Sequence, residues 1–154
     1  MDDRVIELQA DTSTAPKAAA AIGVGVGQIA KTLCFIGKGK AVIVVTAGDV
    51  HVSQSKLKAA LGWTGKLRLA DPQETAEITG YPVGGVCPFA LPQGIPILID
   101  VSLKSYGVIY PAAGSPNSAV RLTPDELYQT TGGMPCNVCN GGQNEGGASG
   151  SEGS

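Results

Sequence analysis

The fold is decided by the stretch Thr32-Leu33-Cys34-Phe35-Ile36-Gly37-Lys38-Gly39-Lys40-Ala41-Val42-Ile43-Val44-Val45. Its two outer runs, residues 32–36 and 41–45, are almost continuously apolar, as in strands that are buried on both faces. The Gly-Lys-Gly-Lys segment between them lacks the spacing of a phosphate-binding Walker loop and is typical of a hairpin turn. The sequence therefore predicts two paired central strands.

Short helices and strands are predicted around this hairpin from their end signals. A Ser, Thr or Asp precedes each helix and a glycine follows it, as helix caps favour. We expect helices at 14–21, 54–61, 72–79 and 124–131, and strands at 5–8, 95–101, 106–110 and 119–122. In the second helix Leu57, Ala60 and Leu61 should face inward. The uneven interleaving predicts an α/β fold of α+β-like character, with one mixed central sheet flanked by helices.

Length and composition predict a single domain followed by a tail. The chain has 154 residues, of which 43% are hydrophobic, so one core can bury about two-thirds of the unfolded surface. We place the domain at 1–135 and a disordered Gly/Ser-rich tail at 136–154. No apolar run approaches the roughly twenty residues of a membrane span, and the N-terminus lacks the features of a secretory signal. We therefore expect a cytoplasmic protein without a membrane partner.

The four cysteines do not form the pattern of a disulfide framework. Cys34 and Cys87 lie in apolar or glycine-rich surroundings, and Cys136 and Cys139 form a single C-x-x-C pair. That pair follows the last predicted helix, whereas a thioredoxin-like motif needs a strand-to-helix junction. A structural zinc site would need further ligands, so we expect reduced thiols and no bound metal.

A glycine loop, Thr79-Gly80-Tyr81-Pro82-Val83-Gly84-Gly85-Val86-Cys87-Pro88-Phe89, separates a predicted helix from a predicted strand. The paired glycines leave the backbone N–H groups of Gly84, Gly85 and Val86 without side-chain cover, as in sites that bind an oxyanion or a carboxylate. A wide turn whose glycines only adopt positive φ is the alternative. A second exposed turn, residues 112–117, contains Gly114 and Ser115.

Basic residues are concentrated in one third of the chain, although the formal net charge is −2. Residues 31–68 contain a single acidic residue, Asp49, and seven basic ones: Lys31, Lys38, Lys40, Lys56, Lys58, Lys66 and Arg68. Such a face could hold a phosphate backbone, for which Lys56, Lys58, Lys66 and Arg68 are the candidate binding residues. The alternative is a set of solvated lysines without a ligand. The acidic composition argues against a dedicated nucleic-acid binder, and no DNA partner is expected.

These motifs together resemble the YbaK and prolyl-tRNA-synthetase-associated editing domain family, whose members deacylate mischarged tRNA. The resemblance covers about residues 14–133. It rests on Gln28-Ile29-Ala30-Lys31-Thr32-Leu33, on Ala47-Gly48-Asp49 with the following Lys-Leu-Lys-Ala-Ala-Leu-Gly helix, on the glycine loop and on Ala112-Ala113-Gly114. Cys87 stands where members often have Ser, and Val5 lies near the place of a tyrosine found in some members.

The resemblance implies an editing pocket and a function. It places Lys31, Gly84, Gly85 and Gly114 around the aminoacyl group and makes Tyr81 a wall residue, and we add Val86, Cys87 and Ser115 as substrate-binding candidates. It implies hydrolysis in trans of tRNA-Pro that carries Ala, Cys or another small amino acid, with prolyl-tRNA synthetase as a further candidate partner.

The chemistry of an aminoacyl ester fits these residues. Lys31 and the backbone N–H groups of Gly84 and Gly85 would polarise the ester carbonyl, and the vicinal ribose hydroxyl would assist the attack. No cofactor is expected. Two alternatives remain: a thiol hydrolase with Cys87 as nucleophile and His51 as base, and a non-catalytic module that binds tRNA or a synthetase.

Overall fold

The hairpin predicted at residues 32–45 forms the centre of the sheet. The structure, a computed structural model, describes residues 5–7, 14–82, 86–114 and 118–140. Strands β2 (Ile29–Gly37) and β3 (Lys40–Ala47) are antiparallel, with Leu33 opposite Val44. Lys38 and Gly39 connect them with φ of 54° and 74°. Two successive positive φ values are typical of the tight turn that matches the twist of a hairpin.

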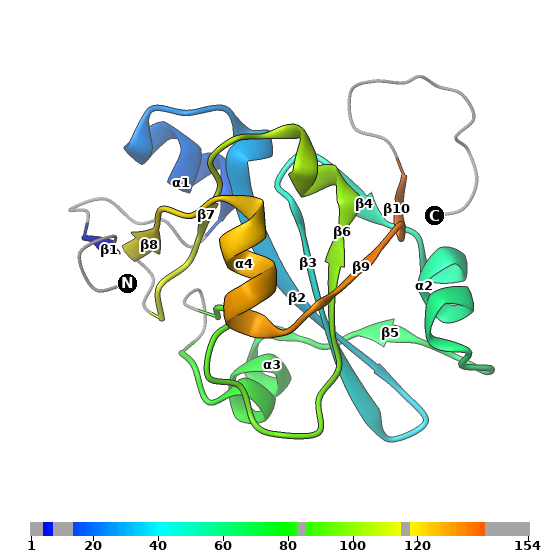
Figure 1. The fold of residues 1–154 in the computed structure, drawn as a ribbon. Coiled ribbons are helices and arrows are strands. Elements are labelled where there is room, and N and C mark those ends of the chain that lie inside the picture. Colours follow the sequence, from blue (N-terminus) through cyan, green and yellow to red (C-terminus); the bar gives the residue numbers. More distant parts are fainter. Residues whose placement is uncertain (1–4, 8–13, 83–85, 115–117, 141–154) are drawn as a thin grey trace.

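Shorter strands extend this hairpin into a mixed sheet (Figure 1). Its order is β5-β2-β3-β6-β9, and β7 pairs with β2 beside this path. Strand β5 (Arg68–Leu69) is antiparallel to β2, whereas β6 (Ile97–Asp100), β7 (Tyr110–Pro111) and β9 (Met134–Cys136) each join in parallel. Two small antiparallel pairs stand apart, namely β1 (Val5–Glu7) with β8 (Ser118–Val120) and β4 (His51–Val52) with β10 (Cys139–Asn140). The α/β fold with a mixed central sheet is confirmed.

Four α-helices begin and end close to the predicted positions. They are α1 (Ala15–Ile22), α2 (Gln54–Leu61), α3 (Pro72–Thr79) and α4 (Pro124–Thr131). The side chains of Thr14, Ser53, Asp71 and Thr123 each cap the first turn, and a left-handed glycine ends each helix. Two short 3₁₀ helices, η2 (Val26–Gln28) and η3 (Val101–Ser105), connect strands. In Figure 1, α1 and α2 lie at opposite ends of the sheet.

The core sits on both faces of β3. Val42, Ile43, Val44 and Val45 are fully buried there. Leu57 of α2 is also fully buried and Leu61 is half-buried, but Ala60 is exposed, contrary to its predicted inward position. The reason is that Leu61 follows Leu57 by about one turn, whereas Ala60 is rotated toward solvent in this two-turn helix.

Two segments differ from the sequence prediction. The strand expected at 106–110 is reduced to Tyr110 in β7, with Ile109 in an isolated antiparallel bridge to Leu122, and η3 occupies the residues just before it. The second segment lies beyond residue 135, where Cys136 belongs to β9 and Cys139–Asn140 form β10.

Partners far away in sequence hold that second segment in place. The buried Asp100 accepts the Val138 N–H at 2.8 Å, and the Val138 carbonyl accepts the Ser53 N–H at 2.7 Å. The described fold therefore extends past the predicted boundary at 135, and the rest of the predicted tail lies outside the described residues. Among the described helices, none has the length and apolar character needed to cross a membrane.

Candidate functional site

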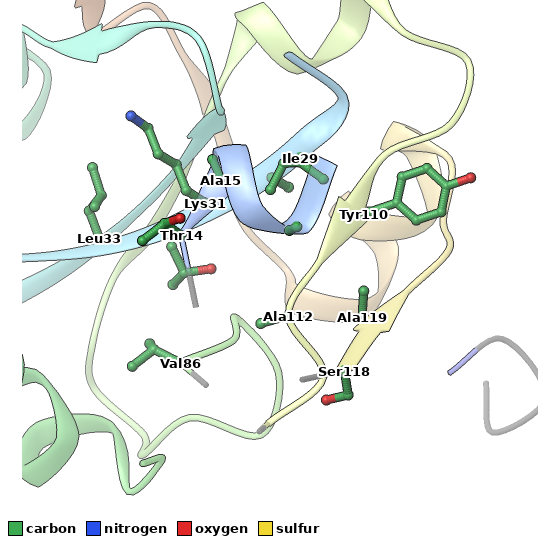
Figure 2. Close-up of a pocket in the computed structure, with 13 residues that line it drawn as sticks. Thr14, Ala15, Ile29, Lys31, Leu33, Val86, Tyr110, Ala112, Ser118 and Ala119 are labelled. Atoms are coloured by element: carbon green, nitrogen blue, oxygen red, sulfur yellow. The ribbon is translucent and has the colours of Figure 1, made fainter. Parts of the chain in front are cut away.

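A small cavity lies beside the first half of β2 (Figure 2). Its volume is about 270 Å³, and its walls come from α1, β2, β7, β8 and the segment at Val86. Most of the wall is apolar, and five of its residues are alanines: Ala15, Ala18, Ala30, Ala112 and Ala119. An apolar lining of this kind suits an apolar side chain of a ligand.

Lys31 is the cationic residue of this lining. It lies on β2 opposite Thr46 and is half-buried. Burial lowers the pKa of its ammonium group below the ordinary 10.5. The charges of Cys139 and Asp49 would raise this pKa, but the effect of burial is larger. In Figure 2 its side chain extends away from Val86, along the opposite side of β2. The structure thus places Lys31 and Val86 on one cavity, with the ammonium group directed away from Val86.

Thr32, the next residue of β2, also lines the cavity and was not selected from the sequence. Its hydroxyl oxygen is buried and has no hydrogen-bond partner among the described residues. A buried hydroxyl without a partner is costly, so such groups are expected where a ligand supplies the missing bond. The signal in the sequence was a polar residue between Lys31 and an apolar run.

The two predicted loops meet through Tyr81 and Gly114. Gly114 has φ of 98°, and a Cβ atom built on it would lie 3.3 Å from the Tyr81 ring. The ring therefore packs against the bare backbone of the second loop, which explains the glycine at this position. Gly84, Gly85 and Ser115, which were predicted to contact substrate, lie outside the described residues.

Cys87 belongs to the glycine loop, as Tyr81 does, and is buried, with 3% of its surface exposed. The Tyr81 hydroxyl donates to the Phe89 carbonyl and also interacts with the Cys87 sulfur. Burial, followed by this contact with Cys87, raises the pKa of Tyr81 to about 12, and burial also raises the pKa of Cys87. His51 is exposed on β4, opposite Asn140. The geometry therefore does not favour Cys87 as a thiolate nucleophile with His51 as its base.

The C-x-x-C pair has the properties of structural thiols. Burial, then the nearby Asp100 carboxylate, raises the pKa of Cys136 to about 12, and the same two causes raise the pKa of Cys139. All four cysteines are unpaired. Within the described ranges, no cluster of His, Cys, Asp or Glu is arranged to hold a metal ion.

The predicted tRNA-binding residues divide between two places. Lys58, Lys66 and Arg68 line a second hollow of about 840 Å³ near the β2–β3 turn, together with Lys38. Lys56 does not line it, and its ammonium group donates to the Cys139 carbonyl at 3.0 Å. Arg68 forms two hydrogen bonds of 2.7 Å with Glu74.

Comparison with known proteins gives a consistent assignment. Residues 9–130 match the family model of the aminoacyl-tRNA editing domain. The chain is 42% identical over 129 residues to the uncharacterized protein YwhH of Bacillus subtilis, a match that covers 83% of this chain and 81% of that protein. It is 28% identical over 146 residues to a proline–tRNA ligase of Pelobacter propionicus, where the match covers 88% of this chain but only 25% of the ligase.

A solved structure agrees in fold. It belongs to a candidate trans-editing enzyme for prolyl-tRNA synthetase and superimposes with a TM-score of 0.80 at 37% identity, covering 89% of this chain and 86% of that one. The resemblance inferred from the sequence motifs is thereby confirmed. The chain belongs to the aminoacyl-tRNA editing domain family.

Proposed function

We propose that this protein hydrolyses mischarged aminoacyl-tRNA in trans, with tRNA-Pro that carries Ala, Cys or another small amino acid as its substrate. The observation that carries this proposal is the small alanine-lined cavity that includes Lys31. Membership of the editing family and likeness to a candidate trans-editing enzyme for prolyl-tRNA synthetase support it.

In the proposed reaction, water attacks the ester carbonyl and the acyl C–O bond to the ribose breaks. The products are the free amino acid and tRNA with a free 3′-terminal hydroxyl. The vicinal hydroxyl of the terminal ribose relays the proton: it takes one from the attacking water and passes its own to the ribose oxygen that leaves. No protein nucleophile takes part, in keeping with the buried Cys87 thiol.

Lys31 and the backbone N–H groups of Gly84 and Gly85 are proposed to stabilise the negative charge that develops on the carbonyl oxygen. Val86, the described neighbour of these glycines, lines the same cavity as Lys31. The ammonium group now extends away from Val86, and the flexible four-carbon stem of lysine allows it to turn toward a bound ester.

Selection of the amino acid is assigned to the lining of the cavity. The alanines present methyl groups to the side chain of the aminoacyl moiety, which is proposed to lie against this wall. The unpartnered Thr32 hydroxyl is proposed to accept a hydrogen bond from the α-ammonium group of the aminoacyl moiety. Tyr81 and Gly114 would hold the surrounding loops at a fixed distance.

The experiment is a panel of tRNAs charged with Ala, Cys, Ser or Pro, in which release of the amino acid is followed over time. We expect release of a small non-cognate amino acid well above the spontaneous rate, while Pro-tRNA stays charged. Lys31→Ala is the control for contaminating hydrolase. If no member of the panel is cleared but charged tRNA binds, the protein is a binding module and the hydrolase proposal fails.

A further inference from the structure

The second hollow, at the far end of β2, carries one sign of charge. It is lined by side chains of the β2–β3 turn, of α2 and of the segment that leads into β5. Its cationic members are Lys38, Lys58, Lys66 and Arg68, and among the described residues that line it there is neither Asp nor Glu. A concave surface of this kind attracts an anion with several charges.

The cations of the hollow are held in different ways. Lys38 donates to the Thr64 hydroxyl at 2.9 Å and Lys58 to the Gly65 carbonyl at 3.1 Å, so the hydrogen-bond partners of both ammonium groups are uncharged. Arg68 is different, because its guanidinium group is already paired with the Glu74 carboxylate. The positive field of the hollow therefore comes mainly from the three lysines.

The position of the hollow relative to the cavity limits its ligand. Residues of β2 line both the cavity and the hollow. Lys31 of the cavity and Gly37 of the hollow are six residues apart on that strand, which corresponds to roughly 20 Å at the usual rise per residue. Figure 1 shows that the two ends of β2 lie at opposite ends of the sheet, the first on the side of α1 and the second on the side of α2. An aminoacyl adenosine is too short to reach both places, whereas a polynucleotide is long enough.

We propose that the hollow binds the phosphate backbone of the acceptor stem of the same tRNA whose aminoacyl end enters the Lys31 cavity. This inference rests on the proposed function and extends it to the path of the substrate. A-form RNA is recognised mainly through its shape, phosphates and 2′-hydroxyls, and compact ammonium groups suit phosphates as point charges. Compared with the binding residues predicted from the sequence, the proposed surface includes Lys38 and leaves out Lys56.

The test compares Lys66→Glu with Lys56→Glu, a matched control that changes the net charge by the same amount, and adds the double variant Lys38→Glu/Lys66→Glu. Lys56 is on α2, carries the same charge and donates to Cys139 outside the hollow. Two substrates are used, mischarged tRNA and a minimal aminoacyl adenosine, and binding of uncharged tRNA is measured at several salt concentrations. Thermal unfolding establishes that each variant is folded.

We expect the double variant to raise the KM for charged tRNA and the Kd for uncharged tRNA by about tenfold. The slope of log Kd against the logarithm of the salt concentration should fall by about one for each lost phosphate contact. Its turnover of aminoacyl adenosine should stay at the wild-type rate. Lys56→Glu should change the Kd less than Lys66→Glu does.

Other outcomes overturn the inference. Equal weakening by Lys56→Glu and Lys66→Glu would indicate a diffuse field without a defined surface, and an unchanged Kd in the double variant would rule the hollow out. A polyglutamate peptide that binds the hollow more tightly than tRNA would assign it to an acidic protein partner. If the wild-type protein hydrolyses neither substrate, the proposed function fails, and the Kd values for uncharged tRNA still decide whether this surface binds RNA.

Discussion

The two ends of β2 present the same side chain, lysine, in two environments. Lys31 is half-buried in a small cavity, and burial lowers its pKa. Lys38 and Lys66 are exposed around a hollow three times as large, about 840 Å³ against about 270 Å³. A charge near low-dielectric walls acts strongly on one nearby atom, whereas exposed charges act weakly and jointly on an extended ligand. We therefore propose that the chemistry takes place at one end of β2 and that the other end binds the substrate.

Among the conservative substitutions, the largest effect is expected from Lys31→Arg at the cavity end. The guanidinium group keeps the positive charge, but it is wider and planar and does not fit a site shaped for an ammonium group. We expect the rate of hydrolysis to fall by about 10² with little change in the unfolding midpoint. Single-turnover kinetics with mischarged tRNA measure this effect. Near-normal rates would mean that charge alone is sufficient there.

A smaller effect is expected from Tyr81→Phe, which keeps the ring against Gly114 but removes the hydroxyl from Phe89 and Cys87. We expect kcat to fall by about fivefold, from roughly 1 kcal/mol of lost hydrogen bonding, while the KM for tRNA is unchanged. Cys87→Ser is the matched control, since it keeps a hydrogen-bonding group, and it should retain most activity. A thousandfold loss in Cys87→Ser would instead support a thiol mechanism.

Thr32→Val should have a comparable or slightly weaker effect, also at the cavity end. It keeps the shape of the side chain and removes a hydroxyl that has no partner in the described structure. The free protein should therefore be as stable or slightly more stable, whereas deacylation should fall severalfold through the lost contact with substrate. Thermal unfolding and steady-state kinetics are measured on the same samples. A loss of stability would show that the hydroxyl has a structural role.

The smallest effect is expected at the hollow, from Glu74→Gln. Hydrogen bonding to Arg68 lowers the pKa of Glu74 from 4.5 to about 2. Because the folded pKa is depressed, this ion pair stabilises the protein above about pH 4.5, and its contribution is lost as the pH falls toward 2. The unfolding midpoints of wild type and variant should thus differ slightly at neutral pH and converge in acid. Both side chains are partly exposed, so added salt should shrink the difference.

The sequence was sufficient for elements that local chemistry determines. The cap of α3 is an example: Asp71 was expected to precede this helix, and Asp71 and Glu74, which are close in sequence, form a capping box at its start. The central hairpin was equally clear, because its apolar runs and turn residues adjoin each other. These signals are complete within about ten residues, which is why they could be read without a structure.

Features that depend on distant partners could not be predicted. Strand β10 exists because Val138 is fixed by Asp100 and Ser53, which are 38 and 85 residues away in sequence. The packing of Tyr81 on Gly114 is likewise a contact between two loops. For Lys31 the sequence identified the residue, but the direction of its side chain depends on how β2 lies against its neighbours.

The division between the two ends of β2 is tested most directly by the maximal rate of hydrolysis of a minimal aminoacyl adenosine. This substrate fits the cavity but does not extend to the hollow. Lys31→Ala should lower the saturated single-turnover rate by about 10²–10³, while Lys38→Glu/Lys66→Glu leaves that rate unchanged. Equal rates for wild type and Lys31→Ala, with both proteins folded, would contradict the assignment of chemistry to the cavity end.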